Sequence, residues 1–190
     1  SDPLVLAFDT SAAHCAAALL LGDRVLAAKG EAMARGQAER LVPMLQEVLK
    51  DGGCDWPQLT RLGVGIGPGN FTGIRISVAL ARGLSLGLGI PAIGVSGFDV
   101  IRQMVPKAAH PAILAPREQV YLDQPQPFQT NLATAPAPLT FAPDAPDQMA
   151  VAMARVAAAK DPGTAPTPLY IRPADAAPAR DVAPLLIDDA

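Results

Sequence analysis

The first residues that could do chemistry are Asp9, Thr10 and Ser11, which directly follow the first short apolar run of the chain. A carboxylate and two hydroxyls at the end of a strand can hold a phosphate group or its metal ion, as in a small ATPase or kinase. A nucleotide clamped between two lobes also needs a second glycine-rich loop, and only Gly163 remains after Gly97. The alternative is that Asp9 orders the turn together with its two neighbours. The sequence favours this structural role, so we predict no catalytic residue and no bound cofactor.

Glycines recur at every second position from Gly63 to Gly69, where backbone N–H groups could approach an anion at the start of a helix. The spacing matches neither the G-x-G-x-x-G fingerprint nor the G-x-x-x-x-G-K-[ST] phosphate loop. We therefore predict a sharp turn between a strand and a helix. In this turn Thr72 would cap the helix, and Gly73 would let another backbone pack closely.

The remaining reactive side chains lack the motifs of known catalytic sites. His14 and His110 are far apart and no H-E-x-x-H motif is present, so we predict no metal site and expect both to be surface or loop residues. No serine lies in a G-x-S-x-G motif or beside an obvious base, which argues against a serine hydrolase. Cys15 and Cys54 have neither zinc-site nor disulfide spacing, so we expect a reducing compartment and place the protein in the cytoplasm.

The first half of the chain has the pattern of a regular sheet with helices. Apolar segments within residues 4–28, two of them separated by Gly22-Asp23, predict an antiparallel meander. Helical spacing at residues 41–49 predicts a helix, and strands and helices should then alternate over residues 62–104. The predicted fold class is α/β: a mixed sheet of three antiparallel strands followed by parallel strands with flanking helices. That order is typical of the ribonuclease-H-like half of actin-like proteins and sugar kinases.

Proline divides the chain, because five of its twenty prolines lie in residues 1–100 and fifteen in residues 101–190. Proline removes a backbone donor, so the second half can form only short strands and one clear helix. We expect a strand pair at residues 112–115 and 119–122, a helix at 147–159 and a further short apolar segment at 169–171. The predicted domains are an actin-like lobe at 1–105, a reduced second lobe at 106–172 and an extended tail at 173–190.

Charge and hydropathy limit the partners of the chain. Fifteen Lys and Arg against eighteen Asp and Glu give a formal net charge of −3, which does not favour direct binding of a nucleic-acid backbone. No uninterrupted apolar run approaches the ~18 residues of a membrane span, so we predict no membrane association. With its catalytic motifs missing, the chain is best interpreted as a protein that works by contact.

Residues 67–76, which read GPGNFTGIRI, resemble the GPGSFTGLRIG signature of the TsaB (YeaZ) family of bacterial tRNA threonylcarbamoyladenosine biosynthesis proteins. Shorter similarities lie at residues 7–11, 38–43 and 169–173, and the resemblance covers residues 4–105 well. It implies a non-catalytic subunit without a cofactor. Such a subunit would bind the transferase TsaD and support the ATPase TsaE in modifying adenosine 37 of ANN-decoding tRNAs. The signature positions are Gly67, Pro68, Gly69, Phe71, Thr72, Gly73 and Arg75.

The same resemblance implies that a metal site of TsaD is absent from this chain, and it indicates where partners bind. TsaD carries two metal-binding histidines after the strand that corresponds to residues 91–95, and this chain has Gly97 and Ile101 at those positions. Family members pair through two helices of the first lobe, with themselves or with TsaD, and tRNA is contacted only through the complex. Six apolar positions are candidate interface residues, although each could instead face the protein's own sheet: Leu41, Met44, Leu45, Val48, Ile76 and Leu80.

Overall fold

Five strands form a mixed sheet in the computed structural model, which describes residues 2–124 and 126–171. The central strand β1 (Leu4–Asp9) pairs antiparallel with β2 (His14–Leu21), which pairs antiparallel with β3 (Arg24–Ala32). On the other side, β4 (Arg61–Gly65) and β5 (Ala92–Val95) run parallel to β1, giving the order β3-β2-β1-β4-β5. The predicted fold class is therefore confirmed.

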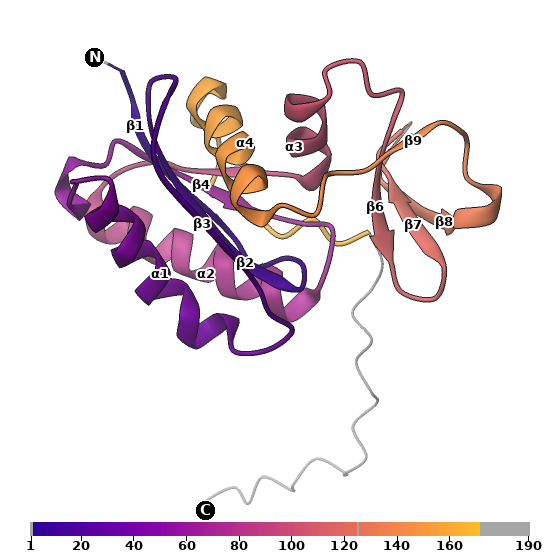
Figure 1. Ribbon diagram of the computed structural model, residues 1–190, viewed down its shortest axis with the longest axis horizontal. Helices are drawn as coiled ribbons and strands as arrows, with labels where there is room; N and C mark the ends of the chain where they lie inside the picture. The colour runs from indigo at the N-terminus through magenta and orange to yellow at the C-terminus, as the bar shows by residue number, and fades with distance from the viewer. Residues whose placement is uncertain (1, 125, 172–190) are drawn as a thin grey trace, which may run out of the picture.

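Helices cover both faces of this sheet (Figure 1). α1 (Gln37–Asp51) and α2 (Phe71–Leu88) lie side by side on one face. α3 (Gly97–Met104) and α4 (Pro146–Ala159) lie on the other face, and a short 3-10 helix, η1 (Trp56–Gln58), precedes β4. The first lobe is thus a layer of strands between two layers of helices.

The central strand β1 is buried on both faces, because successive side chains of a strand point to opposite sides. Leu6 and Phe8 pack in the core beneath α1 and α2, whereas Val5 and Ala7 pack in the core beneath α3 and α4. Asp9 is the last residue of this strand. Its position at the strand end is therefore fixed from both sides by apolar packing.

The helix α4 belongs with the first sheet, although its place in the sequence led us to assign it to the second lobe. It packs on Gly30 of β3 and on Gly63 of β4, where a Cβ would lie 2.8 Å from the Cβ of Ala157. Arg61 Nη1 also donates to three carbonyl oxygens at its end, those of Ala157, Ala158 and Lys160, each at 3.0 Å. The prediction that α4 belongs to a second lobe over residues 106–172 is therefore wrong. The predicted boundary at residue 105 stays a prediction.

A smaller, four-stranded sheet follows α3 in the region predicted to be a reduced second lobe. β6 (His110–Ala115), β7 (Gln119–Leu122) and β8 (Phe128–Asn131) pair antiparallel in succession. The 3-10 helix η2 (Leu132–Thr134) follows, and β9 (Leu139–Thr140) pairs parallel with β6. The strands predicted at residues 112–115 and 119–122 are confirmed as parts of β6 and β7.

The last described residues lie beside the loop that follows β4. Residues 169–171 have no strand structure, and the Leu169 N–H donates to the Ile66 carbonyl oxygen at 2.8 Å. The tail predicted at residues 173–190 lies outside the described residues. The hydrogen bond from Leu169 places this described segment next to the end of β4.

Among the described helices, α2 is long and apolar enough to cross a membrane by length and composition, with a mean hydropathy of 1.2. Core helices of soluble proteins pass the same test. Here Ile74, Val78 and Ala81 of α2 are buried in the core beneath the helix. The absence of membrane association therefore stays a prediction.

Candidate functional site

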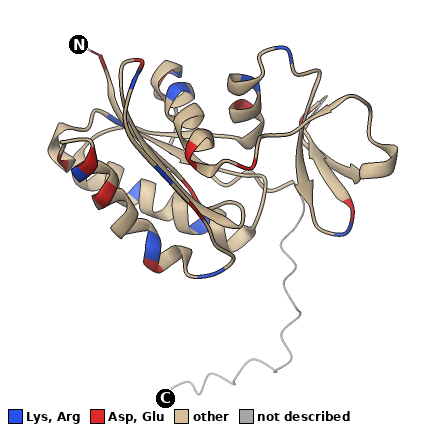
Figure 2. Cartoon of the chain, in the orientation of Figure 1, with Lys and Arg blue, Asp and Glu red and all other residues tan. Residues whose placement is uncertain are grey.

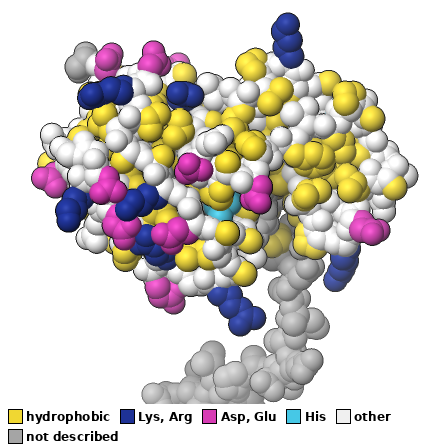
Figure 3. Space-filling model, viewed as in Figure 1, with side chains coloured by type: hydrophobic (Ala, Val, Ile, Leu, Met, Phe, Trp, Pro, Cys, Tyr) yellow, Lys and Arg dark blue, Asp and Glu magenta, His cyan; other side chains and the backbone are white. Residues whose placement is uncertain are grey.

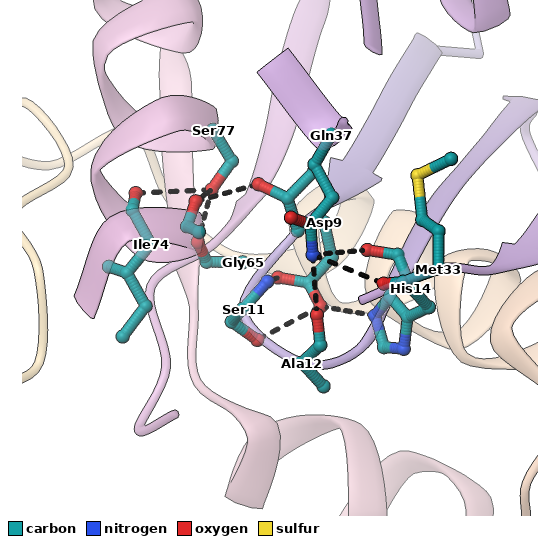
Figure 4. Close-up of polar contacts among 11 residues, drawn as sticks. Asp9, Ser11, Ala12, His14, Met33, Gln37, Gly65, Ile74 and Ser77 are labelled. Carbon is teal, nitrogen blue, oxygen red and sulfur yellow. Dashed lines mark hydrogen bonds and ion pairs between the residues drawn. The ribbon is translucent and has the colours of Figure 1, made fainter. Parts of the chain in front are cut away.

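The Asp9 carboxylate is engaged within its own turn (Figure 4). Asp9 is 4% exposed, and its Oδ1 accepts the Ser11 N–H at 3.1 Å. Its Oδ2 accepts the Ser11 hydroxyl at 2.9 Å and lies 2.7 Å from Nε2 of His14. Both carboxylate oxygens thus have partners inside the β1–β2 turn, and the structural role of Asp9 stays a prediction.

The position of His14 corrects the sequence prediction that both histidines are surface or loop residues. His14 opens β2, is 7% exposed and faces Asp9 across the turn. A buried polar group needs a partner, and the carboxylate supplies one for the imidazole. The signal in the sequence was the separation of five residues between an aspartate and a histidine around a tight turn. Ser11 and His14 do not form the hydrogen-bonded pair of nucleophile and base that a serine hydrolase uses. Asp9 lies between them, and the imidazole contacts the carboxylate and not the hydroxyl.

Backbone from the glycine-rich signature closes one side of the Asp9 turn. The Asn70 N–H donates to the Ser11 carbonyl oxygen at 2.7 Å, and the Thr10 hydroxyl donates to the Gly73 carbonyl oxygen at 2.6 Å. A Cβ at Gly69 would overlap the Ser11 carbonyl oxygen, and a Cβ at Gly73 would overlap that of Thr10. The predicted close backbone approach at Gly73 is therefore confirmed, and the start of α2 occupies the space beside the turn.

Two details of the signature differ from the prediction or refine it. Asn70 and not Thr72 caps α2, because the Asn70 Oδ1 accepts the Gly73 N–H at 2.9 Å while Thr72 is exposed. Asparagine and threonine are both good N-caps, so composition alone did not distinguish them. Gly67 has φ of 94°, a conformation that favours glycine, and a cis peptide bond joins it to Pro68.

Two further signature residues contact the end of the described chain. The Phe71 ring lies 4.9 Å from the Tyr170 ring, centroid to centroid. Arg75 Nε donates to the Tyr170 hydroxyl at 2.9 Å, and its guanidinium lies 5.7 Å from the centroid of the same ring. The signature thus joins the start of α2 to the Asp9 turn on one side and to Tyr170 on the other.

The other side of the Asp9 turn is closed by the start of α1. Gln37 Nε2 donates to the Ala12 carbonyl oxygen at 3.0 Å, and the carbonyl oxygens of His14 and Met33 lie 3.5 Å away (Figure 4). Ser77, one of the serines considered for catalysis, is buried and its hydroxyl lies 3.2 Å from the Gly65 carbonyl oxygen. These polar side chains satisfy backbone groups, so they stabilise the junction of β1, β4, α1 and α2.

The most strongly perturbed charges lie elsewhere, between β3 and α1. Arg40 binds the carboxylates of Glu31 and Glu47 through two hydrogen bonds each, at 2.6 to 2.9 Å, and Lys29 also binds Glu47 at 2.9 Å. Hydrogen bonds from Arg40 and Lys29 lower the pKa of Glu47 to about 2, and one from Arg40 lowers that of Glu31. Figure 3 shows basic and acidic side chains interleaved over this region. These carboxylates are held ionised, so they are unsuited to act as general acids.

The structure corrects four of the six predicted interface residues. Leu41, Met44, Leu45 and Val48 form the apolar stripe of α1 that faces the protein's own sheet, and each is at most 1% exposed. Ile76 and Leu80 on α2 are half-buried, and the exposed large hydrophobic side chains of these two helices are Val42 and Leu86. Periodicity locates an apolar stripe but does not show whether it faces the core or a partner.

The two positions that the resemblance aligns with metal-binding histidines are used for packing. Gly97 donates its N–H to the Gly67 carbonyl oxygen at 2.9 Å, and a Cβ there would lie 2.5 Å from the Ile113 side chain. Ile101 is 1% exposed. Within the described residues, no group of three or more His, Cys, Asp or Glu side chains is placed to hold a metal ion.

Comparisons with known proteins agree with this architecture. Residues 28–165 match the family model "TsaD: tRNA N6-adenosine threonylcarbamoyltransferase". The tRNA threonylcarbamoyladenosine biosynthesis protein TsaB of Escherichia coli is 40% identical over 99 residues, which are 52% of this chain and 42% of that protein. TsaB of Bacillus subtilis is 37% identical over 99 residues, 51% of this chain and 42% of its own length. The chain thus matches less than half the length of these curated relatives.

Solved structures share the fold over most of the chain. YeaZ from Pseudomonas aeruginosa superposes with a TM-score of 0.70 at 24% identity, covering 88% of this chain and 99% of that one. A second Pseudomonas aeruginosa structure, described as similar to peptidase YeaZ, has a TM-score of 0.72 at 24% identity and covers 90% and 100% of the two chains. At this identity the likeness establishes the fold.

Proposed function

Because the chain belongs to the TsaD family of tRNA N6-adenosine threonylcarbamoyltransferases and resembles the TsaB (YeaZ) proteins, we propose that it is a non-catalytic subunit in threonylcarbamoyladenosine modification of tRNA. The observation that carries this proposal is the Asp9 turn, whose carboxylate is engaged and whose two sides are closed by Gln37 and the glycine-rich signature. The packing of Gly97 and Ile101 where TsaD carries metal-binding histidines supports it.

In this proposal the chain acts by binding TsaD and by supporting TsaE in the same complex. The modified position is adenosine 37 of ANN-decoding tRNAs, and the tRNA is held by the complex and not by this chain alone. The net charge of −3 supports that last point, since nucleic-acid binding by one chain requires a concentrated basic surface. The reaction takes place in the cytoplasm.

The binding surface in this proposal lies on the exposed side of α1 and α2. Four predicted contacts are buried in the chain's own core, so the surface consists of what remains exposed: Ile76, Leu80 and Leu86 on α2, with Val42 on α1. These two helices pack together and form one layer of the first lobe (Figure 1). A partner can therefore contact both without disturbing the core.

Reconstitution tests this function directly. Purified chain, TsaD, TsaE, tRNA, ATP and threonylcarbamoyl-adenylate are combined, and modified adenosine is measured with each protein omitted in turn. We expect modification to require this chain together with TsaD, and none with this chain alone. Turnover by the isolated chain, or full activity without it, would contradict the proposal.

Calorimetry separates the proposal from the alternative of a small ATPase. With the Asp9 carboxylate engaged by Ser11 and His14, ATP and magnesium should release no heat of binding to the chain alone. They should also leave its melting temperature unchanged, since a ligand that binds only the folded state raises it. A rise in melting temperature with magnesium-ATP would favour the ATPase.

A further inference from the structure

After α4 the chain returns to the first lobe and crosses the carboxyl ends of β5 and β4. Residues 166–171, which we call the strap, have no helix or strand structure and form the yellow end of the chain in Figure 1. Pro166 is buried, and its Cβ lies 3.4 Å from a Cβ built at Gly94 of β5. The Leu169 N–H donates to the carbonyl oxygen of Ile66, which directly follows β4, at 2.8 Å. Open α/β sheets bind ligands at the carboxyl ends of their parallel strands, so the strap covers an edge where such sites form.

One exposed side chain fastens the strap to the start of α2. The Tyr170 ring packs on Phe71 at 4.9 Å and its hydroxyl accepts a hydrogen bond from Arg75 Nε at 2.9 Å, yet Tyr170 is 40% exposed. No Asp or Glu occurs between Asp55 and Asp99 in the sequence, and Figure 2 shows only basic residues on α2. Arg75 is thus held by a neutral hydroxyl, which is a weaker partner for a guanidinium than a carboxylate. A fastening of this kind is readily undone.

The segment that precedes the strap can act as its tether. Residues 161–165 are all exposed, and within the described part of the chain they make no hydrogen bond or ion pair. No heavy atom lies within 4 Å of a Cβ built at Gly163, so the backbone has room to rotate there. Lys160, just before the tether, is fixed to α3 by its ion pair with Asp99 at 2.9 Å. The strap can therefore leave its place without moving α4.

We propose that the strap is an autoinhibitory cover, which swings away from the carboxyl ends of β4 and β5 while the rest of the first lobe stays folded. Ordering the strap costs conformational entropy, and the contacts that offset this cost are those of Pro166, Leu169 and Tyr170. Segments with few buried apolar contacts open locally at low free energy. Opening makes the Ile66 carbonyl oxygen and the Arg75 guanidinium accessible together. A molecule that uses this edge of the sheet must first displace Tyr170.

The test measures amide hydrogen exchange in the full chain by NMR. The Leu169 amide reports the state of the strap, because it is bonded to Ile66 only while the strap is closed. The amides of β1, the buried central strand, report global unfolding. In the unchanged chain Leu169 should exchange about tenfold or more faster than β1. Tyr170→Ala should speed exchange at Leu169 by about another tenfold and leave β1 unchanged, because the core keeps all its contacts.

Two further variants separate the hydroxyl from the ring and control for the substitution. Tyr170→Phe keeps the ring and loses the hydrogen bond from Arg75, so exchange at Leu169 should rise less, by roughly two- to tenfold. Tyr121→Phe is the matched control, because Tyr121 is 3% exposed on β7 in the second sheet. It should leave exchange at Leu169 as in the unchanged chain.

Three results would overturn the proposal. If Leu169 exchanges as slowly as β1 in the unchanged chain, the strap opens only with global unfolding. If it exchanges as fast as the exposed amides of the tether, the strap is not closed. If Tyr170→Ala speeds β1 as much as Leu169, or Tyr121→Phe acts on Leu169 like Tyr170→Phe, Tyr170 does not fasten a separate strap. All of these measurements use the chain alone, so they do not depend on the proposed function.

Discussion

Replacing Gly73 with alanine tests whether the glycine-rich signature serves to place α2 against the Asp9 turn. The new Cβ would overlap the Thr10 carbonyl oxygen, which belongs to the backbone and cannot rotate away as a side chain could. To relieve the overlap, the first turn of α2 must move away from the end of β1. That movement also lengthens the 2.6 Å hydrogen bond from the Thr10 hydroxyl to the Gly73 carbonyl oxygen.

The size of the effect follows from three contributions to the free energy of unfolding. Overpacking at a tight contact costs about 1–3 kcal/mol. Loss of one buried hydrogen bond costs about 1 kcal/mol more, and the better helix propensity of alanine returns about 1 kcal/mol. The expected net loss is about 2 kcal/mol, which lowers the melting temperature of a chain of this size by roughly 4–8 °C.

Gly83→Ala in the same helix is the matched control, because a Cβ at Gly83 meets no heavy atom within 4 Å. Only the propensity term applies there, so this variant should be more stable than the unchanged chain by up to about 1 kcal/mol. Urea and thermal unfolding of both variants, followed by circular dichroism, give the two signs directly. If Gly73→Ala were as stable as Gly83→Ala, the turn would have room for a side chain, and the closed arrangement of the Asp9 turn would be wrong.

Three further predictions concern other parts of the chain. Arg61→Met should lower the free energy of unfolding by about 1–3 kcal/mol in urea, because α4 loses the donor that binds its terminal carbonyl oxygens; an unchanged midpoint would contradict that role. The folded-state pKa of Glu47, about 2, lies below its usual value of 4.5, so its contribution to stability is present above pH 4.5 and is lost as the pH falls towards 2. Acid titration of Arg40→Met should therefore show a shallower loss of stability over that range, and an identical profile would refute the assignment. Burial raises the pKa of the Cys15 thiol to about 11, so iodoacetamide at pH 8 should modify Cys54 and leave Cys15 unreacted until urea unfolds the chain.

The sheet and its helices could be predicted because local patterns determine them. The apolar segments before residue 28 alternate with turn residues, and hairpin pairing between neighbouring segments is the simplest arrangement of such a pattern. The placement of α4 could not be predicted in the same way. Its contacts depend on small residues far away in sequence, Gly30 and Gly63, and on Arg61, none of which differs locally from other surface or strand residues. An alanine-rich helix can pack on any surface that is lined by small side chains, so its own sequence does not identify the surface it contacts.

The sequence identified the residues of the Asp9 turn but not the side chains that contact them. The structural role favoured for Asp9 stays a prediction, whereas the partner of its carboxylate, His14, had been assigned to the surface and is buried. Side chains five residues apart across a turn meet only if the turn has one particular geometry, and that geometry is set here by Gln37 and the signature loop. The α1 residues predicted at an interface are buried for a different reason. Periodicity locates the apolar stripe of α1 but does not show whether the stripe faces the core or a partner.

The glycine-rich signature has a physical role in this chain that requires no phosphate. Gly69 and Gly73 let the start of α2 meet the Asp9 turn backbone to backbone, while Asn70 caps the helix and hydrogen-bonds the same turn. The direction of α2 is therefore set at its first turn, and the exposed Leu86 further along the helix takes its position from that contact. A substitution in the turn should then weaken binding of a partner to the far part of the helix without touching the partner. In this way the signature loop also determines which surface α2 exposes.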